Sequence, residues 1–289
     1  MCGRYVITSP LDVLRQRFGF IGNAPDYRPR YNLAPRQRAP TVVHREGRVV
    51  VMMTWGLVPS WTKEFATAPR PINARAETAP GLASFRGPIR NGRVLVPATG
   101  FFEWKGAKGT KGRSPFLFRR RDGEPFVFAG LSDHWRSPDG SVLETFTILT
   151  VPPNDLVKSV HDRMPAILRS EHEASWLDPA TPTERACSLL APHPAEEMEA
   201  FEVSPAVNSP AVDRPDLIIP SRPVSFPPFG GHASRRENAP GDTDGKTRIT
   251  EEAIIHEGVQ GGGRAALSGW RPNDQPGFEG SGSNGDGRS

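Results

Sequence analysis

The second residue of the chain is a cysteine whose position gives it unusual chemistry. Cys2 follows the initiator methionine, and because methionine before a small residue is usually removed, we expect the mature chain to begin with Cys2. Its thiol and its α-amine would have ordinary pKa values of about 8.5 and about 8, so both are partly deprotonated nucleophiles near neutral pH. Together they can condense with one aldehyde, the amine as a Schiff base and the thiol by closing a thiazolidine ring. The alternative is that Cys2 is a small hydrophobic residue packed in the core.

Three other segments carry side chains that suit acid–base or positioning roles. Asn73 and Arg75 lie two residues apart, so in an extended chain they share one face. Glu103 lies among aromatic residues in GFFEWK, where apolar surroundings disfavour its charged form and suit a proton-shuttling carboxyl group. His161 lies in SVHDRMP, ahead of a proline turn. Taken singly, each has an equally good structural interpretation: a turn cap for Asn73, an ion pair for Glu103 and an ordinary loop position for His161.

The elements that must position these residues are mostly short strands. Runs rich in Val, Phe and Ile, bounded by Gly, Pro and Asp, predict strands over 49–54, 93–97, 115–118, 126–129 and 145–151. Helices are predicted after Ser9-Pro10, over 174–177 behind a capping box formed by Ser170 and Glu173, and after Thr181-Pro182. Many short strands and few helices predict an α+β fold, with a mostly antiparallel, barrel-like β core and a few peripheral helices.

The composition of the chain changes near residue 226. Of the 29 glycines, 14 lie from Gly230 onward, where few aliphatic side chains remain. Such a stretch cannot bury enough apolar surface to offset its chain entropy. We therefore predict one compact domain over 1–225 and a disordered, glycine-rich tail over 226–289.

Several classes of function are disfavoured by what the sequence lacks. It has no phosphate-binding loop, no dinucleotide fingerprint, no zinc-binding helix motif and no nucleophile elbow, and its seven histidines show no metal-like spacing. We therefore expect no cofactor and no metal. The net charge of +4 permits an anionic partner but does not establish one.

The cysteine count and the hydrophobic pattern bear on the compartment. Two cysteines, Cys2 and Cys187, cannot form a disulfide framework, and Cys187 lies in an apolar-periodic stretch that predicts packing in the core. No apolar run reaches the roughly 18–20 residues of a membrane span, and the N-terminal sequence does not read as a signal peptide. These features predict a cytoplasmic protein with no membrane partner.

Seven motifs occur in order along the predicted domain, and together they resemble one family. They are MCGR, RYNLAP (30–35), WGLVP (55–59), NARAET (73–78), GFFEWK (100–105), HDRMP (161–165) and VSPAVN (203–208). This set resembles the SRAP family, the SOS-response-associated peptidase proteins that shield abasic sites in single-stranded DNA. The resemblance covers about residues 2–225 and does not extend to the tail.

The resemblance implies a fold and a set of residue roles. Family proteins have a compact α+β domain with a barrel-like core and a positively charged groove that holds the N-terminal cysteine. By this resemblance Cys2 captures the ring-opened deoxyribose aldehyde as a thiazolidine, and Asn73 holds the sugar and the terminus in register. Glu103 moves protons during Schiff-base formation and ring closure, and His161 assists ring opening. All four motif positions match, so we expect an active protein.

DNA binding requires positive charge for phosphates and apolar surface for bases. Arg4, Arg75 and Arg163 flank the matched motifs and are the predicted phosphate contacts, with structural ion pairs as the alternative. Trp61 is the predicted stacking surface, although many family members have two adjacent tryptophans where this chain has Trp61-Thr62. The basic run 105–113 fits a solvated loop better than a DNA contact.

Three functions therefore compete on the sequence alone. The first is covalent capture of abasic sites in single-stranded DNA by a monomer, cytoplasmic and nucleoid-associated when bound. The second is a thiol peptidase that uses Cys2 with His161 as nucleophile and base, in its weakest form removing only Met1. The third is a non-covalent module for single-stranded DNA in which Cys2 is incidental.

Overall fold

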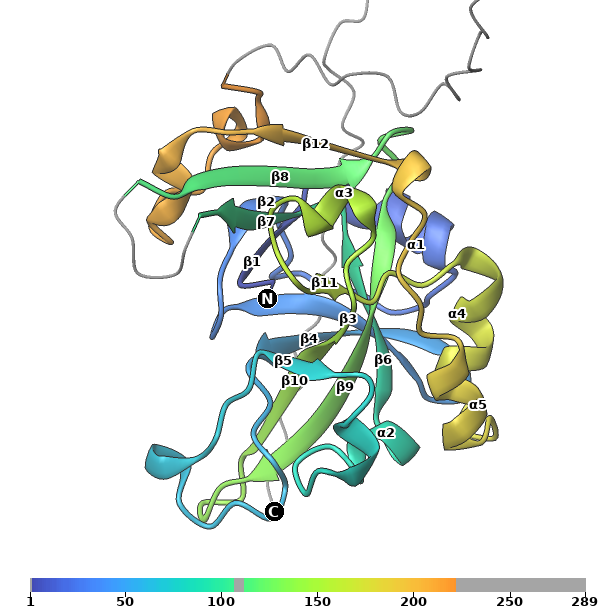
Figure 1. Ribbon diagram of the computed structural model, residues 1–289. Coiled ribbons are helices and arrows are strands. Elements are labelled where there is room, and N and C mark those ends of the chain that lie inside the picture. Colours follow the sequence, from blue (N-terminus) through green and yellow to red (C-terminus); the bar gives the residue numbers. More distant parts are fainter. Residues whose placement is uncertain (1, 107–111, 222–289) are drawn as a thin grey trace, which may run out of the picture. The chain divides into compact units, whose positions relative to one another are not determined.

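The computed structural model describes residues 2–106 and 112–221. The predicted boundary near 226, the predicted tail and the middle of the basic run 105–113 lie outside the described residues. Within them the chain forms two β-sheets with short helices at their edges (Figure 1). This arrangement confirms the predicted α+β class.

The first sheet is antiparallel and five-stranded. Strand β1 lies near one edge and is hydrogen-bonded to β2 on one side and to β7 on the other. The strand order is β12 (Met198–Glu202), β8 (Ser114–Arg120), β7 (Gly100–Lys105), β1 (Arg4–Ile7) and β2 (Arg30–Leu33).

The second sheet closes on itself into a five-stranded barrel. Its order is β11 (Met164–Pro165), β10 (Val142–Val151), β4 (Arg48–Trp55), β3 (Arg38–His44), β6 (Arg93–Ala98) and β9 (Phe126–Arg136), and β9 also pairs with β10. A short strand, β5 (Asn73–Arg75), pairs with β10 outside this path. Most pairs are antiparallel, whereas β10 runs parallel to both β4 and β5. The predicted barrel-like core is thus confirmed, and each of the five predicted strands lies within an observed strand.

Five α-helices lie in the described part of the chain. They are α1 (Leu11–Phe18), α2 (Pro88–Asn91), α3 (Asp155–Lys158), α4 (Ser170–Leu177) and α5 (Thr183–Ser188). Single 3-10 turns are η1 (Phe65–Thr67), η2 (Ala79–Gly81), η3 (Ala195–Glu197), η4 (Pro205–Asn208) and η5 (Pro215–Ile218). None of the helices in these ranges has the length and apolar character needed to cross a bilayer.

The predicted capping box of α4 is wrong. Ser170 is the first residue of the helix, and no side chain caps its N-terminus. Glu173 instead points inward and accepts hydrogen bonds from the Arg17 guanidinium at 2.9 and 3.3 Å. A buried carboxylate needs a charged partner more than a helix end needs a cap, so the tertiary contact determines its orientation.

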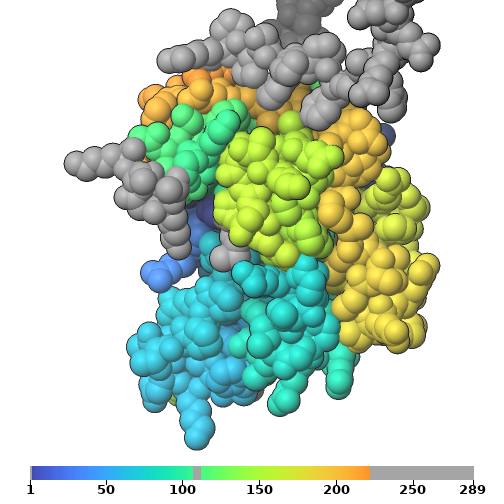
Figure 2. All heavy atoms as spheres, viewed as in Figure 1, coloured from blue at the N-terminus to red at the C-terminus, as the bar shows by residue number. Residues whose placement is uncertain are grey.

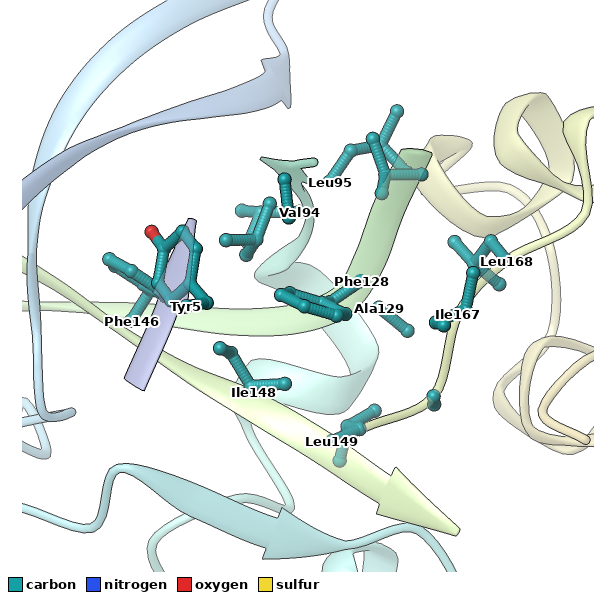
Figure 3. Close-up of a cluster of buried hydrophobic side chains, with 14 of the residues drawn as sticks. Tyr5, Val94, Leu95, Phe128, Ala129, Phe146, Ile148, Leu149, Ile167 and Leu168 are labelled. Carbon is teal, nitrogen blue, oxygen red and sulfur yellow. The ribbon is translucent and has the colours of Figure 1, made fainter. Parts of the chain in front are cut away.

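The core around the barrel also fixes the N-terminal strand. Tyr5 projects from β1 among Phe128, Phe146 and Ile148 (Figure 3). Its ring makes edge contacts with Trp55 at 5.2 Å and with Phe128 at 5.7 Å between ring centroids. Burying an aromatic ring of this size is a large stabilising contribution, so the residues just before Tyr5 are held at a fixed place between the two sheets.

Candidate active site

Pairing of β1 with β7 brings the N-terminal cysteine close to a buried carboxyl group. In this antiparallel pair Arg4 lies opposite Phe102 and Tyr5 opposite Phe101. The register carries Cys2, just before β1, toward the part of β7 that holds Glu103. Both side chains are buried, and the Cys2 Sγ atom lies 3.6 Å from the Arg4 carbonyl oxygen.

Strand β10 brings the other two predicted catalytic residues to the same place. Its residues Ile148–Thr150 pair with β5, which starts at Asn73, and Thr150 and Val151 pair with β11, which follows His161 closely. The Asn73 Nδ2 atom donates a hydrogen bond to the Cys2 carbonyl oxygen at 2.7 Å, which joins the two sheets across the site. The structure therefore brings Cys2, Asn73, Glu103 and His161 together, as the motifs predicted.

The orientation of His161 is set by its own loop. Its Nδ1 atom accepts a hydrogen bond from the Arg163 backbone N–H at 3.0 Å, and its Nε2 atom lies 3.9 Å from Oε2 of Glu103. A neutral ring that accepts at Nδ1 carries its proton on Nε2, toward Glu103. Asp162 is 84% exposed and lies 2.9 Å from Nδ1, a contact that attracts only when the ring is protonated.

Burial changes the acid–base behaviour of the site. It raises the pKa of the Cys2 thiol far above its ordinary value, and the nearby Glu103 carboxylate raises it further. Burial is the largest effect on Glu103 and raises its pKa, while the Arg113 guanidinium, and the His161 ring whenever it is protonated, act in the opposite direction. Desolvation therefore disfavours the thiolate of Cys2 in this buried arrangement.

The side-chain amide of Asn73 has a protein partner for its nitrogen but, in the described part of the chain, none for its oxygen. Oδ1 of Asn73 is buried and has no hydrogen-bond partner within residues 2–106 and 112–221. A buried acceptor without a donor costs free energy, and such atoms are found where a ligand supplies the missing donor. The amide of Asn73 thus holds the N-terminal backbone with its nitrogen, and its oxygen has no donor among the described residues.

Two of the four predicted DNA contacts are accessible. Arg75 ends β5 and is exposed, and Trp61 has 57% of its surface exposed. The loop around Trp61 is anchored by Trp135, whose indole N–H donates to the Thr62 carbonyl oxygen at 2.8 Å. An exposed indole suits stacking with a base.

The other two predicted DNA contacts already have protein partners. The Arg4 guanidinium donates to Asn32 Oδ1 at 2.9 Å, to the Val207 carbonyl at 2.8 Å and to the Asn208 carbonyl at 3.3 Å. The Arg163 guanidinium makes a two-pronged contact with Glu77 at 2.8 and 2.9 Å and also donates to the Thr150 carbonyl. Their role as phosphate contacts stays a prediction, and a structural role is directly visible.

Sequence analysis missed two residues that organise this region. Asn32 is buried and its Nδ2 atom contacts the carbonyl oxygens of Val207, Ser209 and Val212, which ties β2 to η4. Glu77 orients Arg163. Both lie inside matched motifs, Asn32 in RYNLAP and Glu77 in NARAET. Sequence analysis could have found them as polar motif residues to which no role had been assigned.

The surroundings of the site contain few other reactive groups. In the described residues no group of three or more His, Cys, Asp or Glu side chains is arranged to hold a metal ion. Cys187 is half-buried and packs against the edge of the core, whereas packing within the core was predicted. On the face drawn in Figure 2, the N-terminal segment (dark blue) is almost covered by green, yellow-green and cyan segments of later sequence.

The sequence of this chain matches one family model and several known proteins. The family model described as SOS response associated peptidase (SRAP) matches residues 1–210. The chain is similar to abasic site processing protein YoqW of Bacillus subtilis (strain 168), with 40% identity over 222 residues that cover 75% of this chain and 99% of the relative. It is also similar to abasic site processing protein HMCES of Rattus norvegicus, with 30% identity over 271 residues and 76% of each chain covered.

Solved structures give the same fold. A crystal structure of a protein from Bacteroides thetaiotaomicron superposes with a TM-score of 0.70 at 28% identity, covering 76% of this chain and all of that one. A protein from Bordetella bronchiseptica superposes with a TM-score of 0.62 at 27% identity, covering 70% of this chain and all of the other.

Proposed function

This chain belongs to the SRAP family (SOS response associated peptidase), and from that membership and the geometry around Cys2 we propose that it processes abasic sites in DNA. The lesion is a deoxyribose without its base, whose ring-opened form carries an aldehyde. The proposed reaction captures that aldehyde in single-stranded DNA as a covalent thiazolidine on Cys2. The observation that carries the proposal is the hydrogen bond from Asn73 to the Cys2 carbonyl, beside the buried Glu103 carboxyl group.

The reaction has two bond-forming steps after removal of Met1. The α-amine of Cys2 attacks the sugar C1′, the carbonyl oxygen leaves as water, and an iminium ion forms. The Cys2 sulfur then adds to the iminium carbon, its proton leaves, and the nitrogen becomes the neutral amine of a five-membered ring. The net change is one aldehyde, one amine and one thiol converted to a thiazolidine and water.

The raised pKa of Cys2 supports this order. A protonated thiol is a poor nucleophile, so the amine reacts first and the thiol reacts only with the strongly electrophilic iminium carbon. Glu103, whose pKa is raised by burial, can deliver a proton to the departing oxygen and remove one from the thiol. His161, with Nε2 directed at Glu103, assists opening of the sugar ring. The buried Oδ1 of Asn73 is available to accept a hydrogen bond from a sugar hydroxyl.

Closure of the ring determines the outcome for the DNA strand. An iminium ion at C1′ promotes β-elimination and strand cleavage, which is lyase chemistry. The thiazolidine removes the iminium and so protects the strand. On this proposal the amine alone gives a lyase and the thiol converts it into a shield.

Two exposed side chains support a single strand as the partner. Arg75 and Trp61 are exposed, and they offer a cation and a stacking surface. We propose that the protein acts as a monomer in the cytoplasm, at the nucleoid when bound to DNA. A peptidase role receives less support, because a buried thiol with a raised pKa is poorly suited to attack an amide carbonyl.

Intact-mass spectrometry tests the proposal. The purified protein is incubated with a uracil-containing single strand that has been treated with uracil glycosylase. We expect a heat-stable species with the mass of protein minus Met1 plus DNA minus one water, absent for Cys2→Ala and absent when the α-amine is acetylated. Equal cross-linking by Cys2→Ala would refute the proposal. Peptide cleavage that survives acetylation would establish the peptidase instead.

A further inference from the structure

The segment that carries His161 begins at Asn154, a residue that has no role in the proposed chemistry. Asn154 precedes α3, and its Oδ1 atom accepts a hydrogen bond from the Val157 backbone N–H at 2.9 Å. The carbonyl oxygen of Val157 in turn accepts the backbone N–H of His161 at 2.9 Å. The Asn154 side chain therefore caps the helical turn whose last carbonyl oxygen binds the His161 backbone.

The same side chain is anchored to a separate part of the fold. Its Nδ2 atom donates to the His193 carbonyl oxygen at 2.7 Å and lies 3.5 Å from the Met198 sulfur. Its backbone N–H lies 3.3 Å from the sulfur of Met164, which follows the His161 segment into β11. These neighbours are buried, so Asn154 connects both ends of the loop to the edge of the first sheet.

The proposed role of His161 depends on both the position of its ring and the nitrogen that carries its proton. Nε2 of His161 lies 3.9 Å from Glu103, and its tautomer depends on the Arg163 N–H at Nδ1. Displacement of a catalytic group by about 1 Å lowers rates strongly. We propose that Asn154 is a positioning residue that fixes the place and the tautomer of His161. The expected change in cross-linking rate rests on the proposed function, whereas the expected change in the His161 tautomer rests on the fold alone.

Three variants of the full chain separate the contacts. Asn154→Ala removes both the cap and the bridge to His193, whereas Asn154→Ser keeps an acceptor for Val157 but is too short for the bridge. Asn23→Ala is the matched control, because Asn23 Oδ1 also accepts a backbone N–H, that of Ala24 at 2.9 Å, in an exposed turn. The readouts are the cross-linking rate on an abasic oligonucleotide and the tautomer of His161 from long-range proton–nitrogen NMR, assigned with His161→Gln.

The expected results differ among the variants. Asn154→Ala lowers the cross-linking rate about fivefold, as the loss of an N-cap implies, and converts the Nε2–H signal of His161 to a mixture of tautomers. Asn154→Ser gives an intermediate rate with most of the Nε2–H tautomer, and Asn23→Ala changes neither readout.

Two outcomes would overturn the inference. One is a folded Asn154→Ala protein with the wild-type rate and tautomer, and the other is a lowered rate with an unchanged His161 signal. If the alanine variant does not fold, wild-type values for both readouts in Asn154→Ser would have the same effect. A wild-type protein that forms no cross-link contradicts the proposed function instead, and the tautomer comparison then decides the role of Asn154.

Discussion

Asn73 and Cys2 are joined across the two sheets by a hydrogen bond of 2.7 Å from a side-chain amide to a backbone carbonyl. The two residues are 71 positions apart: Asn73 starts β5 of the second sheet, and Cys2 lies just before β1 of the first sheet. This bond orients the backbone of the residue whose amine and thiol carry the proposed chemistry. The second polar atom of Asn73, Oδ1, is buried and has no hydrogen-bond partner among the described residues.

Replacement of Asn73 tests this contact. Asn73→Ala leaves the Cys2 carbonyl without its donor, and Asn73→Asp places a second acceptor against it, so both should slow cross-linking by at least about tenfold. The aspartate variant should be the slower of the two. Rates follow from denaturing gels of an abasic oligonucleotide. Asn91→Ala, at the exposed end of α2, should match the wild type, and a wild-type rate in Asn73→Asp would exclude the proposed role.

Replacement of Glu103 by glutamine should raise the stability of the protein and lower its cross-linking rate. Its pKa is raised on folding, so the native state holds its proton more tightly, and its stabilising effect is lost as pH rises through the raised pKa. Glu103→Gln removes this cost and should be more stable than the wild type at neutral pH. The difference should vanish below about pH 4.3, the ordinary pKa of glutamate.

The same variant should cross-link about 100-fold more slowly, because general acid–base catalysis is lost. Thermal unfolding between pH 4 and 8 and single-turnover rates check both parts. A stability difference that grows as pH falls would contradict the assigned pKa direction.

Glu77 should show the reverse pH dependence. Hydrogen bonds from Arg163 lower the pKa of Glu77, so its pairing stabilises the fold above the ordinary glutamate pKa and this contribution is lost as pH falls. Its side chain is 47% exposed, so solvent screening limits the effect. We expect Glu77→Gln to cost about 0.5 kcal/mol at pH 7 and nothing near pH 3. Urea unfolding at the two pH values measures this.

Arg75 should contribute to the salt dependence of DNA binding. An exposed arginine that neutralises one phosphate of a single strand contributes about 0.7 to the slope of log affinity against log salt. Arg75→Ala should lower the slope by that amount with an undamaged oligonucleotide. Arg185→Ala on α5, away from β5 in Figure 1, is the matched control. An unchanged slope for Arg75→Ala would remove Arg75 from the predicted contacts.

Arg93 should be important for stability and not for chemistry. Within the described residues its buried guanidinium donates to backbone carbonyl oxygens alone, and these contacts connect α2 with the end of α4. The acceptors belong to Ile89, Arg90, Trp176, Asp178 and Thr181. Arg93→Met should cost about 3 kcal/mol because these carbonyls lose their donors. Urea unfolding should show the loss, while folded protein cross-links at the wild-type rate.

The sequence by itself predicted the local features of this protein. Short runs rich in β-branched and aromatic residues predicted five strands, because these side chains pack well on the pleated, half-buried surface of a sheet. The four candidate catalytic residues were identified from residue chemistry and motif order, and the structure brings them together. The other seven strands in the described part of the chain were not predicted: β1, β2, β3, β5, β7, β11 and β12. Among them, β5 and β11 are only three and two residues long, and both form where β10 supplies their hydrogen bonds.

Only the tertiary structure decided how each charged group is used. Arg4 and Arg163 were predicted as phosphate contacts, yet Asn32, Val207 and Glu77 bind them within the fold. The cysteine thiol was expected to ionise near neutral pH, yet burial between two sheets raises its pKa. Residue type determines which reactions a side chain can perform, whereas desolvation and partners from distant sequence determine its protonation and its availability.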